Sequence, residues 1–267
     1  MNYTFVTLTD ENYFYKAKQT IYDLRTRGKW YGSIVCICVD FSLPDNFKEE
    51  YNITQISFPK INKKELVDKI GTNFPNWDGR EFNKLNQWEK LHVFDDYFLQ
   101  WKYVIFMDAG LRVLDSVKYL LNLDCKNKFL APNDAGYNNK SDKIFSTQIC
   151  FRDINIINEF TNEFNNEVMI SQYFLNCIWI YDTNILKTIK KQEFIDYMNK
   201  YPFCKTNEMA IMNIILHFKY KLWEPFPYFT NNEKFLFDWC ELNNSGTDWT
   251  NYCYIKYPVT IGFDNNI

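Results

Sequence analysis

A single carboxylate follows a strongly apolar stretch near the middle of the chain. Tyr103–Met107 reads Tyr-Val-Ile-Phe-Met, and Asp108, Ala109 and Gly110 come directly after it. The two small residues leave room for a bulky ligand. A carboxylate repels an anionic ligand such as a diphosphate, so it would bind one through a divalent cation with oxygen ligands. The alternative is that Asp108 only caps the following turn.

The elements that would position Asp108 alternate between strands and helices. The patterns predict strands at Tyr3–Thr9, Ser33–Val39, Ile53–Phe58 and Tyr103–Met107, and helices from Asp10 to Gly28 and from Arg80 to Gln100. This order predicts an α/β fold with a mostly parallel sheet flanked by helices. Ligands bind such sheets at the carboxyl ends of the strands, and Asp10 and Asp108 both follow predicted strands.

The second half of the chain has a less regular pattern. It predicts strands at Phe129–Ala131 and Gln172–Tyr181, a polar loop at Pro132–Lys143, and helices at Ile185–Lys200 and Asn207–Phe218. The aromatic tail from Trp223 onward has no clear assignment. Neither a repeat nor a low-complexity linker marks a boundary, so we expect one domain over residues 1–267.

Several short segments occur in an order that resembles a known enzyme family. They are Phe5–Thr9, Lys90–His92, Val104–Ala109, Leu130–Asp134, Phe174–Ile178, and Asn207–Glu208 with Asn213. Together they resemble the first strand, Lys-Leu helix, metal-binding strand, Ala-Pro-Asp segment, Phe-Asn-Ser-Gly strand and Asp-Gln helix start of the glycogenin-like glycosyltransferases, family 8. Each match is short, and their shared order from about Tyr3 to Leu216 carries the resemblance.

This resemblance implies a fold and an activity. The fold would be of GT-A type, a Rossmann-like sheet flanked by helices, with a nucleotide-binding half at residues 1–110. The acceptor and sugar half would cover residues 111–267, with an insertion at about 137–170 that forms an extra lobe or lid. The activity would be transfer of a sugar from a nucleotide-diphosphate donor, a UDP-sugar, to a glycan or protein acceptor, with retention of configuration.

The resemblance also assigns roles to individual residues. Donor binding would involve Thr7, Leu8, Thr9, Asp10, Tyr13, Lys90, Asp108, Ala109, Gly110, Asn176 and Lys256. Thr7, Leu8 and Asp10 would hold the base and ribose, and Asn176 would face the sugar. Lys90 would pair with a phosphate or with a carboxylate of the site, unless it is an ordinary helix-surface lysine.

The catalytic group would consist of Glu208, Asn207 and Asp134. Asp134 would accept hydrogen bonds from hydroxyls of the donor sugar, and Glu208 would be the carboxylate nearest the anomeric carbon. Catalysis would rest on positioning and on stabilisation of the leaving group, with little acid–base work. The alternative for Glu208 is a carboxylate that interacts with the dipole at a helix N-terminus.

The metal site of the family is incomplete in this sequence. The family motif is Asp-x-Asp, but its third position here is Gly110. The segment Tyr254–Pro258, which includes Lys256, lies where the family would have a C-terminal histidine. One hypothesis is that Asp108 still holds Mn²⁺ or Mg²⁺, with phosphate oxygens and waters completing the shell. The other is that Lys256 neutralises the diphosphate without a metal. We favour the weakly retained metal at this stage.

Bulk properties exclude several other classes. The formal net charge is −3 without a basic stripe, which disfavours nucleic-acid binding. The first strand is not followed by the Gly-x-Gly-x-x-Gly turn of a dinucleotide oxidoreductase. A catalytically silent nucleotide-sugar or glycan-binding module on the same fold remains the main alternative.

The sequence also suggests a compartment. No apolar run approaches the ~18 residues of a membrane span, and no signal peptide is recognisable at the start. The eight cysteines lack metal-finger spacing, which favours reduced thiols. We therefore expect a cytoplasmic protein, in the host cytoplasm if the source is viral. The sequence does not indicate an oligomeric state.

Overall fold

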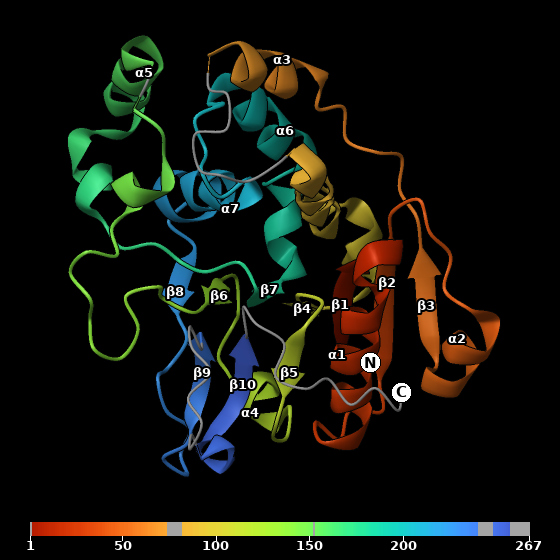
Figure 1. Cartoon of the computed structure of the whole chain (residues 1–267). Coiled ribbons are helices and arrows are strands. Elements are labelled where there is room, and N and C mark those ends of the chain that lie inside the picture. Colours follow the sequence, from red (N-terminus) through yellow and green to blue (C-terminus); the bar gives the residue numbers. More distant parts are fainter. Residues whose placement is uncertain (1, 74–81, 152, 240–247, 257–267) are drawn as a thin grey trace.

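The structure, a computed structural model, describes residues 2–73, 82–151, 153–239 and 248–256. Its main sheet has seven strands in the order β3-β2-β1-β4-β7-β6-β8. These are β1 (Tyr3–Thr9), β2 (Ser33–Cys38), β3 (Ile53–Ile56), β4 (Tyr103–Met107), β6 (Phe129–Ala131), β7 (Ile178–Asp182) and β8 (Trp223–Pro225). Figure 1 shows β3, β2 and β1 on the right and β6 and β8 on the left.

The main sheet is mostly parallel. Strands β3, β2, β1 and β4 are parallel neighbours, β7 runs antiparallel to both β4 and β6, and β8 is parallel to β6. A second sheet consists of β5 (Leu111–Val113), β10 (Tyr252–Lys256) and β9 (Phe235–Trp239), and it lies below the main sheet in Figure 1. The predicted α/β class with a mostly parallel sheet is confirmed. The aromatic tail that had no assignment supplies β8, β9 and β10.

Helical segments surround the main sheet in two groups. One group contains α1 (Phe14–Thr26), which contacts β1 and β5, and α2 (Asp45–Tyr51), which contacts β3. The other contains the 3₁₀ segment η2 (Phe82–Phe94) with α3 (Lys64–Asn73), α6 (Lys191–Lys200) and α7 (Glu208–Met212). Outside residues 137–170, the other helical segments are η1 (Glu11–Tyr13), η3 (Asp96–Gln100), α4 (Lys118–Leu121), η6 (Thr183–Lys187), the π-helix η7 (Asn213–Lys219) and η8 (Trp249–Asn251).

Several predicted boundaries differ from the structure. The helix predicted over 80–100 is two 3₁₀ segments, η2 and η3. The side chain of Asp95 accepts a hydrogen bond from the Tyr97 N–H and so starts a new segment. Residues 80 and 81 lie outside the described residues. The helix predicted over 185–200 is likewise divided, into η6 and α6. The helix predicted over 207–218 is α7 followed by the π-helix η7.

The strand predicted over 172–181 starts only at Ile178, although the residues before it are buried. The side-chain amide of Asn213 explains the difference. Its Oδ1 accepts from the Phe174 N–H at 2.9 Å, and its Nδ2 donates to the Phe174 carbonyl at 3.0 Å. A side chain thus satisfies backbone groups that a neighbouring strand would otherwise satisfy.

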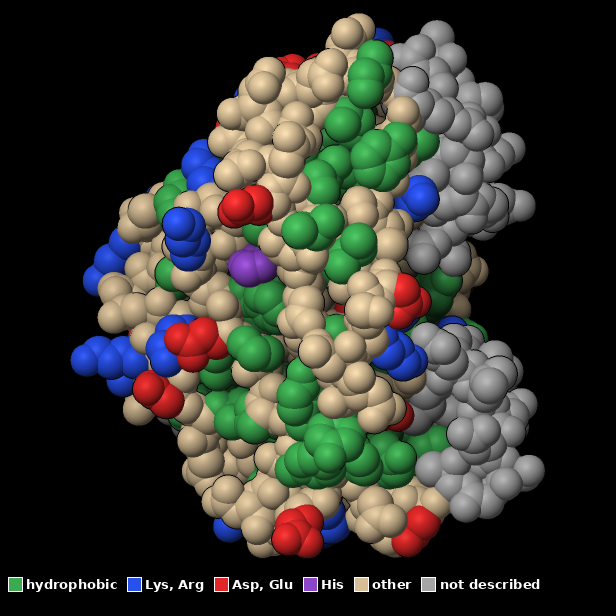
Figure 2. Space-filling model, turned by 90° about the vertical axis from the view of Figure 1, so that its left-hand side faces the viewer, with side chains coloured by type: hydrophobic (Ala, Val, Ile, Leu, Met, Phe, Trp, Pro, Cys, Tyr) green, Lys and Arg blue, Asp and Glu red, His purple; other side chains and the backbone are tan. Residues whose placement is uncertain are grey.

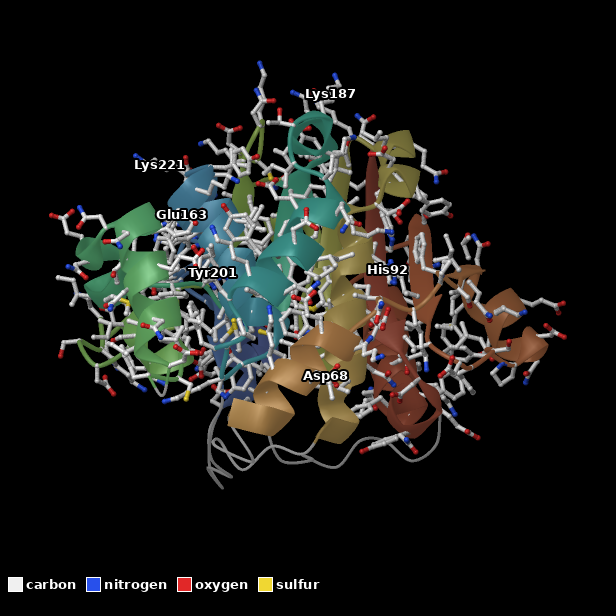
Figure 3. The ribbon with its side chains drawn as sticks, turned by 90° about the horizontal axis from the view of Figure 1, so that it is seen from above. Asp68, His92, Glu163, Lys187, Tyr201 and Lys221 are labelled. Atoms are coloured by element: carbon white, nitrogen blue, oxygen red, sulfur yellow. The ribbon has the colours of Figure 1, made fainter. Side chains whose placement is uncertain are left out.

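The predicted insertion at about 137–170 contains η4 (Phe145–Gln148), α5 (Ile154–Phe164) and η5 (Asn166–Ile170). Helix α5 stands at the upper left of Figure 1, beyond β8. It is fastened to α6 through Glu163, which accepts hydrogen bonds from Tyr197, Lys200 and Tyr201. Figure 3 shows Glu163 and Tyr201 facing one another across this contact. The division into a nucleotide half and an acceptor half stays a prediction.

Stacked aromatic rings form the core beneath the ends of the central strands. Phe106 of β4 stacks on Trp179 of β7 with ring centroids 4.0 Å apart, and the ring of Phe94 is parallel to that of Trp179 with centroids 6.4 Å apart. Phe94, Phe106 and Trp179 are completely or almost completely buried. The close packing of these rings fixes the position of the end of β4. Within the described part of the chain, every helix is too short or too polar to cross a membrane.

Candidate active site

Strand β4 ends in a tight turn at Asp108. The Asp108 N–H donates to the Cys177 carbonyl at 2.8 Å, and the Leu111 N–H donates back to the Asp108 carbonyl at 3.0 Å. Gly110 has a φ of +88°, and its N–H donates to Thr20 Oγ1 of α1 at 3.0 Å. Most residues avoid this backbone region, so the turn requires glycine. The missing second aspartate therefore coincides with a position where any side chain is strained.

Two lysines bracket the carboxylate of Asp108. Lys90 Nζ lies 2.8 Å from Asp108 Oδ1 and 2.9 Å from Glu208 Oε1. Lys256 Nζ lies 3.4 Å from Asp108 Oδ2 and donates to the Ala109 carbonyl at 3.0 Å. We call Lys90, Asp108, Glu208 and Lys256 the charged cluster. It joins η2, the end of β4, the start of α7 and the end of β10.

The inner part of the charged cluster is buried. Burial alone would lower the pKa of Lys90, but Asp108 and Glu208 outweigh it and raise that pKa above its ordinary value. Burial raises the pKa of Glu208, and Lys90 opposes part of the rise. Asn176 Nδ2 donates to Glu208 Oε1 at 2.9 Å, while Glu208 Oε2 has no hydrogen-bond partner among the described residues. Buried charges of this kind are tolerable only when paired.

A small cleft of about 100 Å³ opens beside this cluster. Its lining residues are Leu8, Thr9, Asp10, Tyr13, Asn86, Gln87, Lys90, Asp108, Ala109 and Lys256. Most of the residues predicted to bind the donor therefore lie together, at the carboxyl ends of β1 and β4. Thr7, Gly110 and Asn176 do not line the cleft: Thr7 is buried, Gly110 lies within the turn, and Asn176 contacts Glu208.

Asn86 and Gln87 were not predicted from the sequence. Asn86 Nδ2 donates to Asp10 Oδ2 at 2.9 Å, and Asp10 Oδ1 accepts from the Tyr13 N–H at 3.0 Å, which makes Asp10 the expected helix cap. Gln87 Oε1 accepts from Asn207 Nδ2 at 2.6 Å. Both precede Lys90 by about one turn of the same segment, and this spacing is the signal that could have found them.

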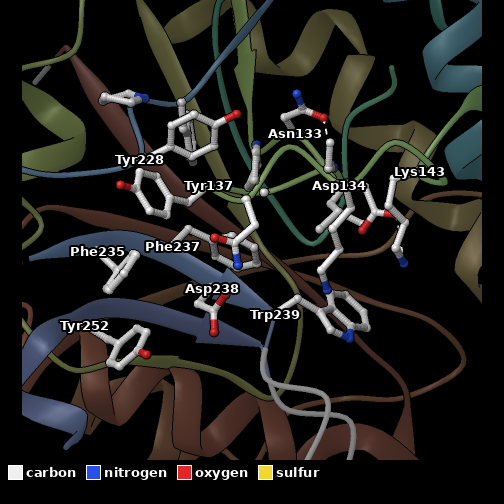
Figure 4. A pocket seen from close by; sticks show the side chains of 18 residues that line it. Asn133, Asp134, Tyr137, Lys143, Tyr228, Phe235, Phe237, Asp238, Trp239 and Tyr252 are labelled. Atoms are coloured by element: carbon white, nitrogen blue, oxygen red, sulfur yellow. Dashed lines mark hydrogen bonds and ion pairs between the residues drawn. The ribbon is translucent and has the colours of Figure 1, made fainter. Parts of the chain in front are cut away.

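A larger cavity of about 440 Å³ lies near Asp134. Figure 4 shows the side chains of Asp134 and Lys143 beside each other at one end and a group of rings at the other. The aromatic lining residues are Tyr137, Phe226, Tyr228, Phe235, Phe237, Trp239 and Tyr252. The remaining lining includes the carboxylate of Asp238 and the ammonium groups of Lys140 and Lys143.

Asp134 is held by residues of the predicted insertion and of the segment before β7. It accepts a hydrogen bond from the Tyr173 hydroxyl, and Lys143 Nζ lies 3.5 Å from Asp134 Oδ2. Gln148 Nε2 donates to the same Tyr173 hydroxyl at 2.7 Å. Burial, followed by the nearby Asp134, raises the pKa of Tyr173. The carboxylate is therefore oriented at the cavity wall, which suits it to accept hydrogen bonds from a ligand.

The rings of the larger cavity support one another and reach the surface. Tyr137 meets Tyr228 edge-on at 5.9 Å, and Phe235 stacks on Tyr252 at 5.1 Å. Figure 2 shows patches of apolar side chains on the face of the molecule that lies on the left of Figure 1, where β8 and β9 are. Tyr137 is 59% exposed and Trp239 is 37% exposed. Part of the aromatic surface is thus open to a ligand.

The two cavities are close neighbours. Leu175 lines the larger cavity, and the next residue, Asn176, contacts Glu208 of the charged cluster. On the second sheet, Lys256 of the small cleft pairs in register with Trp239 of the larger cavity. A ligand in one cavity therefore lies within reach of a ligand in the other.

The residues around Asp108 do not fit a divalent cation. Both carboxylate oxygens face lysine ammonium groups, and the described residues contain no group of three His, Cys, Asp or Glu side chains placed for a metal. His92 pairs with Glu89 at 2.8 Å, and His217 lies against Trp223 at 4.6 Å. Mn²⁺ and Mg²⁺ need several oxygen or nitrogen ligands, and here one carboxylate faces two cations.

The sequence matches no protein-family model and no curated protein. Its structure, however, is similar to several solved glycosyltransferases. The galactosyltransferase LgtC, in complex with donor and acceptor sugar analogues, aligns with a TM-score of 0.59 and 12% identity over 96% of this chain and 87% of that chain. The bifunctional glycosyltransferase WbbM, in its apo form, aligns with a TM-score of 0.60 and 14% identity over 96% of this chain and 46% of that chain. The chain has the GT-A glycosyltransferase fold.

A third GT-A structure is core-mannan synthase A from Aspergillus fumigatus in its Mn/GDP form, with a TM-score of 0.53 and 11% identity over 85% of this chain and 73% of that chain. The chain spans less than half the length of WbbM, at 46%, and of the glycosyltransferase GlyE from Streptococcus pneumoniae, at 44%. At these identities the likeness concerns the GT-A fold. The activity has to be argued from the site.

Proposed function

We propose that the protein is a glycosyltransferase that moves a sugar from a UDP-sugar to a glycan acceptor. One observation carries the proposal. On a GT-A fold, most of the predicted donor residues line a small cleft, and an aromatic cavity of about 440 Å³ opens close to it. Two adjoining sites of different chemistry are what group transfer between a nucleotide and a second substrate requires.

The small cleft suits the nucleotide. Leu8 and Thr9 bring the end of β1 to the cleft, where their backbone groups would hold the base, as the resemblance implies. The side chain of Asp10 would accept from ribose hydroxyls. The diphosphate would lie over the turn at Asp108 and Ala109, next to the ammonium of Lys256.

The larger cavity suits a sugar ring. The apolar faces of a pyranose stack on aromatic side chains, while its hydroxyls need carboxylate or amide partners at the rim. Tyr137 and Trp239 provide exposed rings, and Asp134 and Asp238 provide carboxylates in the same cavity. This combination favours a glycan over a protein as the acceptor, and it leaves room for Asp134 to contact either sugar.

The chemical step would depend on positioning and on charge. Glu208 lies at the start of α7, where Lys90 and Asn176 hold it in one orientation. Asn207, which precedes it, has a φ of +52° and is fixed by Gln87. We propose that Glu208 stabilises positive charge at the anomeric carbon. Retention of configuration is what the resemblance to family 8 implies.

A panel of nucleotide sugars tests this function. The protein is incubated with UDP- and GDP-sugars, with and without Mn²⁺, and both thermal stabilisation and slow donor hydrolysis are measured. We expect a UDP-sugar to stabilise the protein and to be hydrolysed, and oligosaccharides to accelerate release of UDP. If no nucleotide sugar raises the melting temperature, the proposal is wrong.

The loss of the family's metal ligands favours one second candidate, a catalytically silent module that binds the nucleotide sugar. The same panel distinguishes the two. Stabilisation by a UDP-sugar without hydrolysis or transfer, across acceptors and conditions, would favour the silent module.

A further inference from the structure

Asp108 occupies the position at which a divalent cation would bridge protein and diphosphate, yet its surroundings already contain cations. Lys90 approaches Oδ1 at 2.8 Å and Lys256 approaches Oδ2 at 3.4 Å. A divalent ion bound to this carboxylate would lie within a few ångströms of two ammonium groups. Such like charges repel strongly in a partly buried site.

Position 110 cannot easily restore a second carboxylate. Its φ of +88° is strained for any residue with a side chain, and an added Cβ would approach Lys16 Cδ to 3.2 Å. The tail segment in which the resemblance places the family's histidine contains Lys256 instead. The two differences from the family's metal site are thus consistent with each other. Gly110 removes a carboxylate ligand, and Lys256 places a positive charge near Asp108.

The two lysines differ in their surroundings. The side chain of Lys90 is 8% exposed and is committed to two close carboxylates. The side chain of Lys256 is 15% exposed, lines the small cleft and makes only the longer contact with Asp108. Its ammonium also donates to the Ala109 carbonyl, which places it directly over the turn. Lys90 therefore neutralises the carboxylates, while Lys256 is the cation that faces the ligand.

We infer that Lys256 binds the diphosphate of the donor in place of a divalent cation, so that the site works without a metal. This inference rests on the proposed function and specifies how the same site holds its donor. In the reaction, the bond between the anomeric carbon and the diphosphate oxygen breaks, and its electron pair stays on that oxygen. The Lys256 ammonium stabilises the new negative charge. The acceptor oxygen bonds to the anomeric carbon, and its proton passes to the leaving diphosphate.

Calorimetric titration of the protein with UDP and with uridine, in excess EDTA and in millimolar MnCl₂, tests the inference. We expect UDP to bind in EDTA, with a Kd that Mn²⁺ changes less than about threefold. Lys256→Ala should weaken UDP binding about 10- to 100-fold, as expected for a charge-assisted hydrogen bond, and leave uridine binding unchanged. Lys256→Arg should retain most of the UDP affinity, because the charge remains.

Two further variants keep the test sharp. Lys187→Ala is the matched control. Lys187 is an exposed lysine of η6, which follows the antiparallel strand β7 and therefore lies near the start of β4, at the other end of the strand from Asp108. Asp108→Asn distinguishes the metal bridge from the lysine site, because the two predict opposite changes in UDP affinity. A metal bridge predicts weaker UDP binding in this variant. The lysine site predicts severalfold tighter binding in EDTA, because Lys256 loses a competing carboxylate.

The outcomes are distinguishable. UDP binding that requires Mn²⁺, or that survives Lys256→Ala in a folded protein, would overturn the role of Lys256 and leave the proposed function standing. If neither UDP nor uridine binds under either condition, the proposed function itself fails, and the role of Lys256 with it. Circular dichroism of each variant establishes that it is folded before binding is compared.

Discussion

The small cleft and the larger cavity lie side by side but are built from different interactions. The charged cluster holds the small cleft through ion pairs between buried and partly buried side chains from four separate elements. The larger cavity is lined by rings that touch edge to face or stack, with its carboxylates at the rim. The comparison suggests that charge positions the donor and shape positions the acceptor. Damage to the first region should therefore affect both folding and donor binding, whereas damage to the second should affect the acceptor alone.

The largest expected effect comes from Lys90. Lys90→Met leaves Glu208 and one oxygen of Asp108 without their buried cation, so we expect a loss of about 3–5 kcal/mol in the free energy of unfolding. Urea denaturation measures it, with Lys187→Met as the exposed lysine control. The double variant Lys90→Met/Glu208→Gln should recover part of the loss, because one of the uncompensated charges is gone. A loss below about 1 kcal/mol would show that the ion pairs are not what holds this region.

Acid should weaken the region that supports the larger cavity. His217 lies against Trp223 of β8, and burial lowers its pKa from 6.5 to about 4. The unfolded chain therefore takes up the proton first, so the stability associated with neutral His217 is present above pH 6.5 and falls as the pH drops toward 4. Between pH 7 and pH 5 we expect His217→Gln to lose about 2 kcal/mol less than the parent protein. Urea unfolding at the two pH values measures the difference, and equal losses would contradict the prediction.

A smaller effect is expected from the exposed rings of the larger cavity. Tyr137→Ala and Trp239→Ala each remove a stacking surface, so we expect the KM for an oligosaccharide acceptor to rise about tenfold while the Kd for UDP stays unchanged. Tyr31→Ala is the matched control, because Tyr31 is 73% exposed and precedes β2 at the other edge of the sheet. A change in UDP affinity in the cavity variants would show that the two regions are not separate.

The strands within residues 1–110 were predictable because their signal is local. Strands β1 and β4 coincide with the predicted ranges, and Asp10 caps the following segment as expected. An apolar run that stops at a carboxylate identifies a strand end without any knowledge of its neighbours. The segment before β7 was not predictable in the same way. It resembles a strand, but the N–H and the carbonyl of Phe174 are satisfied by the side chain of Asn213, about forty residues later.

In the candidate site, too, some features were predictable from the sequence and others were not. Residues 90, 108 and 208 were singled out from the order of short segments, and Lys256 was singled out as a cation in the tail. The loss of two metal ligands was also visible in the sequence. The sequence did not show which of these charged side chains form ion pairs with one another. The larger cavity was not foreseen at all, because its rings come from residues 137 and 226–252, and most of them lie in the tail that had no assignment.

The sequence by itself determined the α/β pattern, the carboxylates at the strand ends and the absence of an Asp-x-Asp pair, because periodicity and residue type are properties of neighbours along the chain. Only the tertiary structure decided that Lys90 and Lys256 meet on opposite oxygens of Asp108, since β10 reaches the end of β4 through the second sheet. Electrostatic energy depends on distances of a few ångströms in a partly buried environment, and such distances between remote segments exist only in the folded chain.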